Sequence, residues 1–213
     1  MRAATENITL RGGRIRDITA LLDVRAMKAK NVLVTGRPGV GKTTAVLKAV
    51  EELRRSGYAV GGFVTREVRV EGRREGFIMV DLAKGEQAYL ARVGEGRPRV
   101  GRYVVFIHEL ERLGVPAILN AIEQADIVVV DEIGPMELLS QKFKRAVLKA
   151  LESSKPVLAT IHYRAGESDF GKAVLGRGDC RVVTVTEANR ERAARDIAKL
   201  VLEALASAKD KTT

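Results

Sequence analysis

The stretch that decides the fold of this chain is GRPGVGKT, at residues 36–43. It matches GxxxxGK[ST] at every fixed position, a pattern that forms a glycine-rich loop around phosphate groups. The glycines let backbone N–H groups turn inward, and a lysine and a hydroxyl group complete the binding site. The phosphate-contacting residues that it predicts are Gly36, Arg37, Pro38, Gly39, Val40, Gly41, Lys42, Thr43 and Thr44.

The segments on both sides of this loop have the patterns that such a loop needs. Residues 31–35 form a short apolar run that is typical of a buried strand. Residues 44–55 repeat apolar side chains with helical spacing, and Gly57 follows as a stop signal. This order places the positive end of the helix dipole at the phosphates. We therefore expect Lys42 to reach the β- and γ-phosphates and Thr43 to bind Mg²⁺.

A second apolar run, at residues 127–130, leads into the acidic pair Asp131-Glu132. A strand that is apolar on both faces is typical of the inside of a parallel sheet. Ligands of open α/β sheets collect at the carboxyl ends of such strands, which places the acidic pair beside the loop. We expect Asp131 to hold the Mg²⁺ shell through water and Glu132 to polarise the attacking water. The predicted catalytic residues are thus Lys42, Asp131 and Glu132, and the predicted Mg²⁺ ligands are Thr43 and Asp131.

Further candidates follow the strand predicted at residues 156–161. Thr160 and His162 could contact the γ-phosphate or the attacking water, although a lone histidine is as often a solvated residue. Arg164 is a candidate cation for the negative charge that spreads during phosphoryl transfer. Most arginines are surface residues, so this role stays open between Arg164 and three arginines of a predicted hairpin, Arg66, Arg69 and Arg74.

Three other residues also have two interpretations. Glu137 is an alternative base if Glu132 points away from the phosphates. The pair Asn189-Arg190 could flank the base of a nucleotide, or could simply begin a helix. Cys180 has no visible activating partner, so we interpret it as a small, buried or half-buried residue rather than a nucleophile.

Composition excludes several classes of protein. The chain has 213 residues, 46% hydrophobic and 30% charged, as expected for a globular domain rather than a disordered one. A single cysteine excludes a disulfide framework and gives no zinc-binding spacing. No apolar stretch has membrane-spanning length, and the N-terminus has no apolar signal core. We therefore expect a cytoplasmic protein without a membrane partner, and the oligomeric state stays open.

The formal net charge is +10, from 37 lysines and arginines against 27 acidic residues. Such an excess suits nucleotides, which are polyanions, and it also suits nucleic acid. Aromatic residues make up only 4% of the chain and do not alternate with the basic clusters, which argues against a stacking surface for single strands. Nucleic acid is thus a possible partner but is not favoured over nucleoside triphosphates.

The order of predicted elements indicates a three-layer α/β fold. Strands alternate with helices over residues 31–206, which implies a mostly parallel sheet with helices on both faces. Residues 67–82 predict a β-hairpin, which we place at one edge of the sheet. Residues 1–30 form a basic N-terminal extension, in which apolar spacing at residues 15–27 predicts a short helix. Residues 207–213 form a polar C-terminal tail.

Three segments together resemble the cancer-related nucleoside-triphosphatase family: NVLVTGRPGVGKTT, GFVTREVRVEGRREGFIMVDL and VVVDEIGPMEL. The resemblance covers about residues 31–206, and the second and third segments are more particular than the loop alone. It implies a RecA-like P-loop fold and slow, Mg²⁺-dependent hydrolysis of several nucleoside triphosphates. It also implies nucleotide binding by Val128, Val129, Val130, Asp131, Glu132, Ile133 and Gly134.

These patterns predict a hydrolase that cleaves the β–γ phosphoanhydride of ATP, GTP and other nucleoside triphosphates, with Mg²⁺ as cofactor and broad base tolerance. A nucleotide or small-molecule kinase is the main alternative, with residues 164–177 as a short lid. The glutamate directly after Asp131 favours water over an acceptor hydroxyl. A nucleic-acid-associated, nucleotide-binding module is the third possibility. Nothing in the sequence fixes the preferred base, or whether an arginine of this chain or of a partner completes the site.

Overall fold

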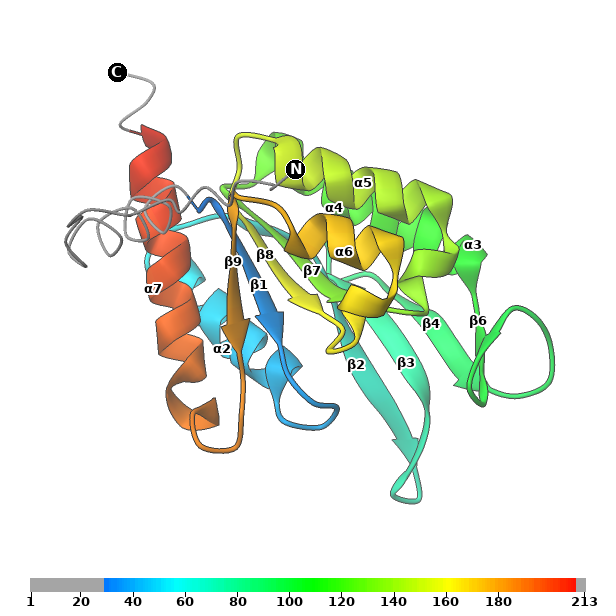
Figure 1. Ribbon diagram of the computed structural model, residues 1–213. Coiled ribbons are helices and arrows are strands. Elements are labelled where there is room, and N and C mark those ends of the chain that lie inside the picture. Colours follow the sequence, from blue (N-terminus) through cyan, green and yellow to red (C-terminus); the bar gives the residue numbers. More distant parts are fainter. Residues whose placement is uncertain (1–28, 210–213) are drawn as a thin grey trace, which may run out of the picture.

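The computed structural model describes residues 29–209, which fold around a nine-stranded sheet (Figure 1). The strands lie in the order β5-β6-β4-β3-β2-β7-β8-β1-β9. The predicted helix at residues 15–27 lies outside the described residues, as does most of the predicted extension. The strand bounds are β1 Asn31–Thr35, β2 Val60–Val70, β3 Arg73–Asp81, β4 Gln87–Val93, β5 Arg99–Val100, β6 Tyr103–Val105, β7 Ile127–Ile133, β8 Val157–Ile161 and β9 Cys180–Thr184.

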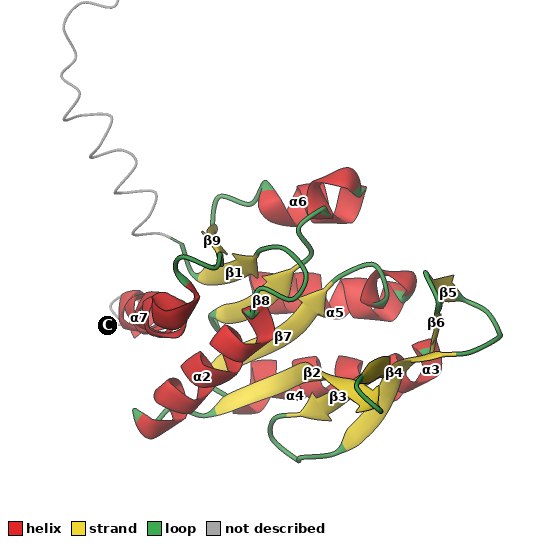
Figure 2. Cartoon of the chain, turned by 90° about the horizontal axis from the view of Figure 1, so that it is seen from below, coloured by secondary structure: helices red, strands yellow, loops and turns green. Residues whose placement is uncertain are grey.

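Helices cover both faces of the parallel strands, which confirms the predicted three-layer α/β fold (Figure 2). One layer consists of α2 and α7, and the other contains α4, α5 and α6. No helix in the described part of the chain is long and apolar enough to cross a membrane. The helix bounds are α2 Lys42–Arg55, α3 Ile107–Glu109, α4 Val115–Gln124, α5 Gln141–Glu152, α6 Asp169–Leu175 and α7 Arg190–Lys209.

The central strand β7 shows why its first four residues are apolar without alternation. Val128 and Val130 pack in the core cluster beside α4 and α5, whereas Ile127 and Val129 pack in the cluster beside α2 and α7. Successive residues of a strand point to opposite faces, so a strand between two helical layers needs apolar side chains on both. The strand continues to Ile133, so Asp131 and Glu132 are among its last three residues and do not lie in a loop.

Strand β2 changes its pairing along its length. Val60–Phe63 pair in parallel with β7, and Phe63–Val70 pair antiparallel with β3 across a turn at Glu71-Gly72. Strands β4, β6 and β5 extend this antiparallel edge. Residues 65–77 form a projecting hairpin that extends past the carboxyl ends of β1 and β9 (Figure 1). The predicted hairpin edge is confirmed, and the hairpin overhangs the edge of the sheet where ligands bind.

The region between β8 and β9 differs from its prediction. Instead of a lid, residues 164–177 contain a 3₁₀ turn at Ala165–Glu167 and the helix α6, whose Val174 is buried in the core. Ser168 caps this helix by accepting a hydrogen bond from the Gly171 N–H. A Cβ at Gly171 would lie 2.0 Å from the Ala165 carbonyl oxygen, so close packing requires a residue that disfavours helices. Because glycine disfavours helices, the sequence around Gly171 does not predict α6.

Two adjacent glycines let β2 fit between α4 and β7. A Cβ at Gly61 would lie 2.8 Å from the Ala121 Cβ on α4. Gly62 has a φ of +98°, and a Cβ there would lie 2.0 Å from the Val129 carbonyl oxygen on β7. Since no side chain fits in that space, the pairing of β2 with β7 depends on Gly62.

We expect Gly62→Ala to destabilise the protein far more than Gly57→Ala. Both glycines have a positive φ, but nothing lies within 4 Å of a Cβ built at Gly57. Backbone strain alone should lower the free energy of unfolding of Gly57→Ala by about 1–2 kcal/mol. Gly62→Ala should lose at least about 4 kcal/mol, because β2 must also move away from β7. Urea unfolding measures both losses, and equal losses would show that close approach is not what Gly62 provides.

Candidate active site

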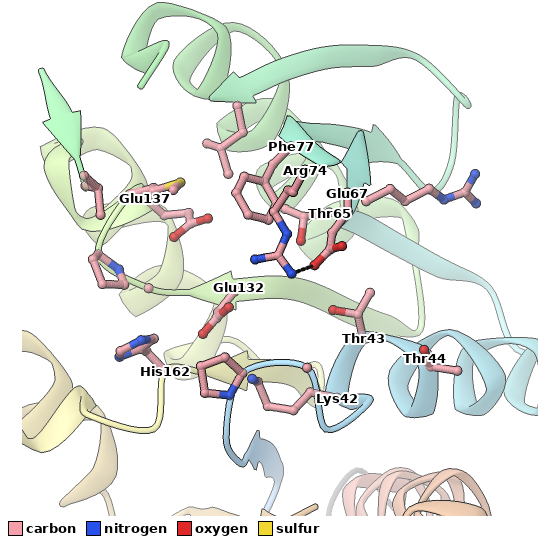
Figure 3. Close-up of a pocket in the computed structure, with 18 of the residues that line it drawn as sticks. Lys42, Thr43, Thr44, Thr65, Glu67, Arg74, Phe77, Glu132, Glu137 and His162 are labelled. Atoms are coloured by element: carbon pink, nitrogen blue, oxygen red, sulfur yellow. Dashed lines mark ion pairs between the residues drawn. The ribbon is translucent and has the colours of Figure 1, made fainter. Parts of the chain in front are cut away.

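The phosphate loop, residues 36–43, joins β1 to α2 at the carboxyl edge of the sheet (Figure 3). Gly36, Gly39 and Gly41 all have positive φ, at 151°, 78° and 102°. Gly41 is the N-cap residue of α2 and gives that helix no side-chain cap. The first N–H groups of α2 are therefore left for an anion, with the helix dipole behind them. The Lys42 ammonium donates to the Gly36 carbonyl oxygen at 3.1 Å, across the mouth of the loop.

Asp131 is the centre of a hydrogen-bond network behind the phosphate loop. Its Oδ1 accepts from the hydroxyl of Thr160 at 2.5 Å and from that of Thr43 at 3.3 Å. Its Oδ2 accepts from the N–H and the hydroxyl of Thr65, at 3.2 and 3.3 Å. Asp131 is only 1% exposed, and burial raises the pKa of its carboxyl group, while the four hydrogen bonds act in the opposite direction.

Glu132 points toward the phosphate loop (Figure 3). Its Oε1 is buried and has no hydrogen-bond partner among the described residues. Burial raises the pKa of Glu132, and the nearby charge of Lys42 lowers it. A carboxylate with a free oxygen at the phosphate end of the site can accept a proton from water. Glu132 thus has one oxygen without a hydrogen-bond partner among the described residues at this end of the site.

The first cavity, about 540 Å³, lies between the phosphate loop and the projecting hairpin. This volume is in the range of small-molecule sites. From the predicted site its walls include Lys42, Thr43, Glu132, Gly134, Glu137 and His162. From the projecting hairpin they include Thr65, Arg66, Glu67, Arg74 and Phe77. The cavity thus joins two segments that lie far apart in the sequence.

Thr160 and His162 lie at different depths. Thr160 is buried and acts on Asp131 rather than on the cavity. Strand β8 lies between β1, which leads into the phosphate loop, and β7, which carries the acidic pair. The end of β8 therefore lies between the ends of those two strands. His162 lines the cavity, where burial and then the charge of Lys42 lower its pKa, which favours the neutral imidazole.

Arg164 does not line the first cavity. Its side chain is 60% exposed and lies 3.6 Å from Glu167 and 5.5 Å from the centre of the Tyr163 ring. It follows the end of β8 and precedes the 3₁₀ turn and α6. Arg164 thus differs from Lys42, Glu132 and His162, which all line that cavity.

The side chains of Val128, Val129 and Val130 belong to the core. All three side chains are fully buried in the two core clusters and line neither cavity. Ile133 is buried as well. These residues hold the acidic pair in place, because the strand that carries it is packed between two helical layers.

Glu137 lies beside Glu132 but in a more buried place. It is 4% exposed, and a Cβ at Gly134 would lie 3.0 Å from its Oε2 and 3.4 Å from the Glu132 Cδ. Burial, and then the charge of Glu132, raises the pKa of Glu137 well above its ordinary value. The two carboxyl groups therefore differ in protonation, with Glu137 holding its proton to higher pH. This difference favours Glu132 as the base.

A second cavity, about 810 Å³, lies on the other side of the phosphate loop. It shares Pro38 and Gly39 with the first cavity, and the loop after β9 forms its far wall at residues 184–188. Tyr163 and Arg190 also line it. Asn189 instead bonds the backbone of that loop, accepting from the Thr186 N–H at 2.8 Å, and so shapes the wall.

Cys180 lies outside both cavities, half-buried at the start of β9. Its Sγ lies 3.7 Å from an oxygen of Asp179. Burial, and then the charge of Asp179, raises the pKa of the thiol to about 11. A thiol with such a pKa is not an activated nucleophile.

Within residues 29–209, arginine side chains contact aromatic rings at four places. Three contacts lie on the antiparallel edge: Arg74 with Phe77, Arg92 with Tyr89 and Arg102 with Tyr103, at 5.6, 5.2 and 5.2 Å from the ring centres. The fourth is Arg164 with Tyr163. The two residues of each pair lie within three positions of each other in the sequence, so these are local cation–π contacts.

The residues around Asp131 fit a magnesium ion. The Thr43 hydroxyl and the Asp131 carboxylate are adjacent hard oxygen donors, which Mg²⁺ prefers. Residues 29–209 contain no group of three or more His, Cys, Asp or Glu residues that could hold a metal alone. Since Mg²⁺ usually takes one or two protein ligands together with phosphates and water, this small donor set is sufficient.

A glycine loop that opens a helix, with an acidic strand end behind it, defines a P-loop nucleotide-binding protein. A family model described as NTPase matches residues 31–198. The chain belongs to this NTPase family.

Individual relatives agree with this assignment. The nucleoside-triphosphatase THEP1 of Thermofilum pendens is 56% identical over 180 residues, 82% of this chain and 99% of that protein. Its namesake in Methanocaldococcus jannaschii is 42% identical over 174 residues, 82% of this chain and 98% of that protein. A solved structure of a human cancer-related nucleoside triphosphatase has a TM-score of 0.71 and 41% identity, covering 81% of this chain and 97% of its own. The predicted family is confirmed.

We expect Glu137→Gln to stabilise the protein increasingly as the pH rises. The folded-state pKa of Glu137 is raised, so the folded chain binds this proton more tightly than the unfolded chain does. Stability therefore falls as the pH rises from the unfolded toward the folded pKa, and glutamine removes that fall. Urea unfolding between about pH 5 and pH 8 measures the difference. The exposed Glu123→Gln on α4 should follow the wild type, and a pH-independent gain for Glu137→Gln would contradict the prediction.

Proposed function

We propose that this chain hydrolyses nucleoside triphosphates at the β–γ phosphoanhydride, uses Mg²⁺ and tolerates different bases. The observation that carries the proposal is the unpartnered, buried oxygen of Glu132 on the cavity side opposite the phosphate loop. Names of relatives, such as nucleoside-triphosphatase THEP1, support the same reaction.

The reaction needs one water molecule and one proton acceptor. The water oxygen forms a bond to the γ-phosphorus as the bond from that phosphorus to the β–γ bridging oxygen breaks. Glu132 takes a proton from the water, and the diphosphate leaves with the bridging oxygen. Lys42 and the N–H groups of the phosphate loop stabilise the charge that spreads over the phosphoryl oxygens. When bound, Mg²⁺ would neutralise charge on the β- and γ-oxygens, with Thr43 as its ligand and Asp131 acting through water.

The second cavity supports broad base tolerance. It adjoins the phosphate loop but is not lined by Lys42, Thr43 or Glu132, so we place the nucleoside half of the substrate there. Tyr163 offers a ring that is 46% exposed. Stacking on an aromatic ring does not select a base, because every base has a π-face.

The kinase alternative lacks support from the predicted lid. A kinase must bind an acceptor hydroxyl where the hydrolase binds water. The segment expected to cover such an acceptor, residues 164–177, is packed on the sheet as a 3₁₀ turn and α6. Water is therefore the favoured acceptor.

We expect the purified protein to release phosphate from ATP, GTP, CTP and UTP, with values of kcat/KM within about tenfold of one another. Excess EDTA should abolish release, and added Mg²⁺ should restore it. The measurement is continuous phosphate release, with labelled ATP and a panel of nucleosides and monophosphates alongside. Labelled acceptor without free phosphate would instead identify a kinase.

We expect Glu132→Gln to lower kcat at least about 100-fold while nucleotide binding is kept, since glutamine cannot take the proton. Lys42→Ala should weaken both binding and turnover, because Lys42 contacts phosphate in the ground state and the transition state. Binding of a non-hydrolysable ATP analogue separates the two effects. Glu123→Gln on the surface of α4 is the matched control. Wild-type turnover in Glu132→Gln would remove the glutamate from its role.

A further inference from the structure

The projecting hairpin places one arginine over the phosphate loop. Figure 3 shows the guanidinium group of Arg74 between Phe77 and Glu132, joined to Glu67 by an ion pair. Arg74 lies 5.6 Å from the centre of the Phe77 ring, which limits where its guanidinium group can move. Its Nε is buried and has no hydrogen-bond partner among the described residues. Arg74 therefore has an unused donor inside the first cavity.

Two other arginines of the predicted set, Arg66 and Arg69, lie on the same hairpin. Arg69 also pairs with Glu67, at 2.7 Å, but it does not line the cavity. Arg66 lies between Thr65 and Glu67 in β2, and neighbouring strand residues point to opposite faces. Arg66 also lines the first cavity, but its side chain leaves the strand from the face opposite the two that contact Asp131 and Arg74.

The charge in the first cavity requires a second cation. The carboxyl groups of Glu67, Glu132 and Glu137 line it, and a nucleoside triphosphate adds several negative charges. Lys42 alone faces these charges from the phosphate loop. Phosphoryl transfer spreads charge over the γ-phosphoryl oxygens, and planar bidentate donors such as arginine match those oxygens.

We propose that Arg74 is the transition-state cation of this site, supplied by the same chain and held by Glu67 until substrate binds. The proposal rests on the proposed hydrolysis. A half-exposed ion pair is weak, and Arg74 is only 34% exposed and Glu67 37%, so the more highly charged γ-phosphate can take the guanidinium group from the carboxylate. Phe77 keeps that group in the cavity during the exchange. An arginine from a partner chain is then not needed.

The test compares Arg74→Ala with Arg69→Ala. Both remove an arginine that pairs with Glu67, but only Arg74 lines the cavity. Arg74→Ala should lower kcat at least about 100-fold, as removal of a transition-state donor does, with the dissociation constant of a non-hydrolysable ATP analogue changed less than about threefold. It should also lose binding of ADP with aluminium fluoride, a mimic of the transition state. Arg69→Ala should keep both properties.

Two further variants keep the test decisive if Arg74→Ala fails to fold. Arg74→Lys keeps the charge but loses the bidentate geometry, and should recover only part of the activity. Glu67→Gln should lower the KM for ATP about two- to fivefold, because the substrate no longer competes with a carboxylate. A folded Arg74→Ala or Arg74→Lys with wild-type kcat, or a Glu67→Gln with unchanged KM, would overturn the proposal. A wild-type protein that releases no phosphate would instead overturn the proposed function on which this role rests.

Discussion

The hydrogen bonds to the Asp131 carboxylate are the constraint on which the rest of the site depends. Four donors reach it, from Thr43 in α2, Thr65 in β2 and Thr160 in β8, while Asp131 itself belongs to β7. A buried carboxylate without these donors would be strongly unfavourable, so the four elements must keep their places for it to remain. The same network fixes the end of the phosphate loop relative to the acidic pair. The geometry for binding a nucleotide is therefore built into the core of the domain.

Several features of the fold and site can be read from the sequence because their signals are local. The phosphate loop is encoded in eight consecutive residues, and β7 in an apolar run followed directly by Asp131-Glu132. The helix α6 is not readable, since Gly171 is set by packing against Ala165 rather than by helix propensity. The segment 128–130 shows what the sequence leaves out about side-chain direction. It accompanies the acidic pair in the sequence, but strand alternation sends its side chains into the core.

The choice among four arginines needs the tertiary structure. Arg66, Arg69, Arg74 and Arg164 are the same residue type in similarly polar segments, so no local pattern separates them. What separates them is the register of β2 on β3 and the direction in which the chain leaves β8. The pairing of Arg69 with Arg74 follows a bulge after Val68, a detail that no hydrophobic pattern encodes. Register therefore selects the arginine that lies between Phe77 and Glu132.

One face of β2 connects the core to the chemistry. Phe63, Thr65 and Glu67 are two residues apart and so lie on the same face of the strand. The first packs in the core, the second donates to Asp131, and the third holds Arg74. Because β2 also pairs with β7 through its first four residues, the strand that carries Asp131 and Glu132 and the strand that positions Arg74 are hydrogen-bonded to each other. The separation between base and cation is thus set by a sheet register, which is more rigid than a loop and suits a site that must present both charges to one phosphoryl group.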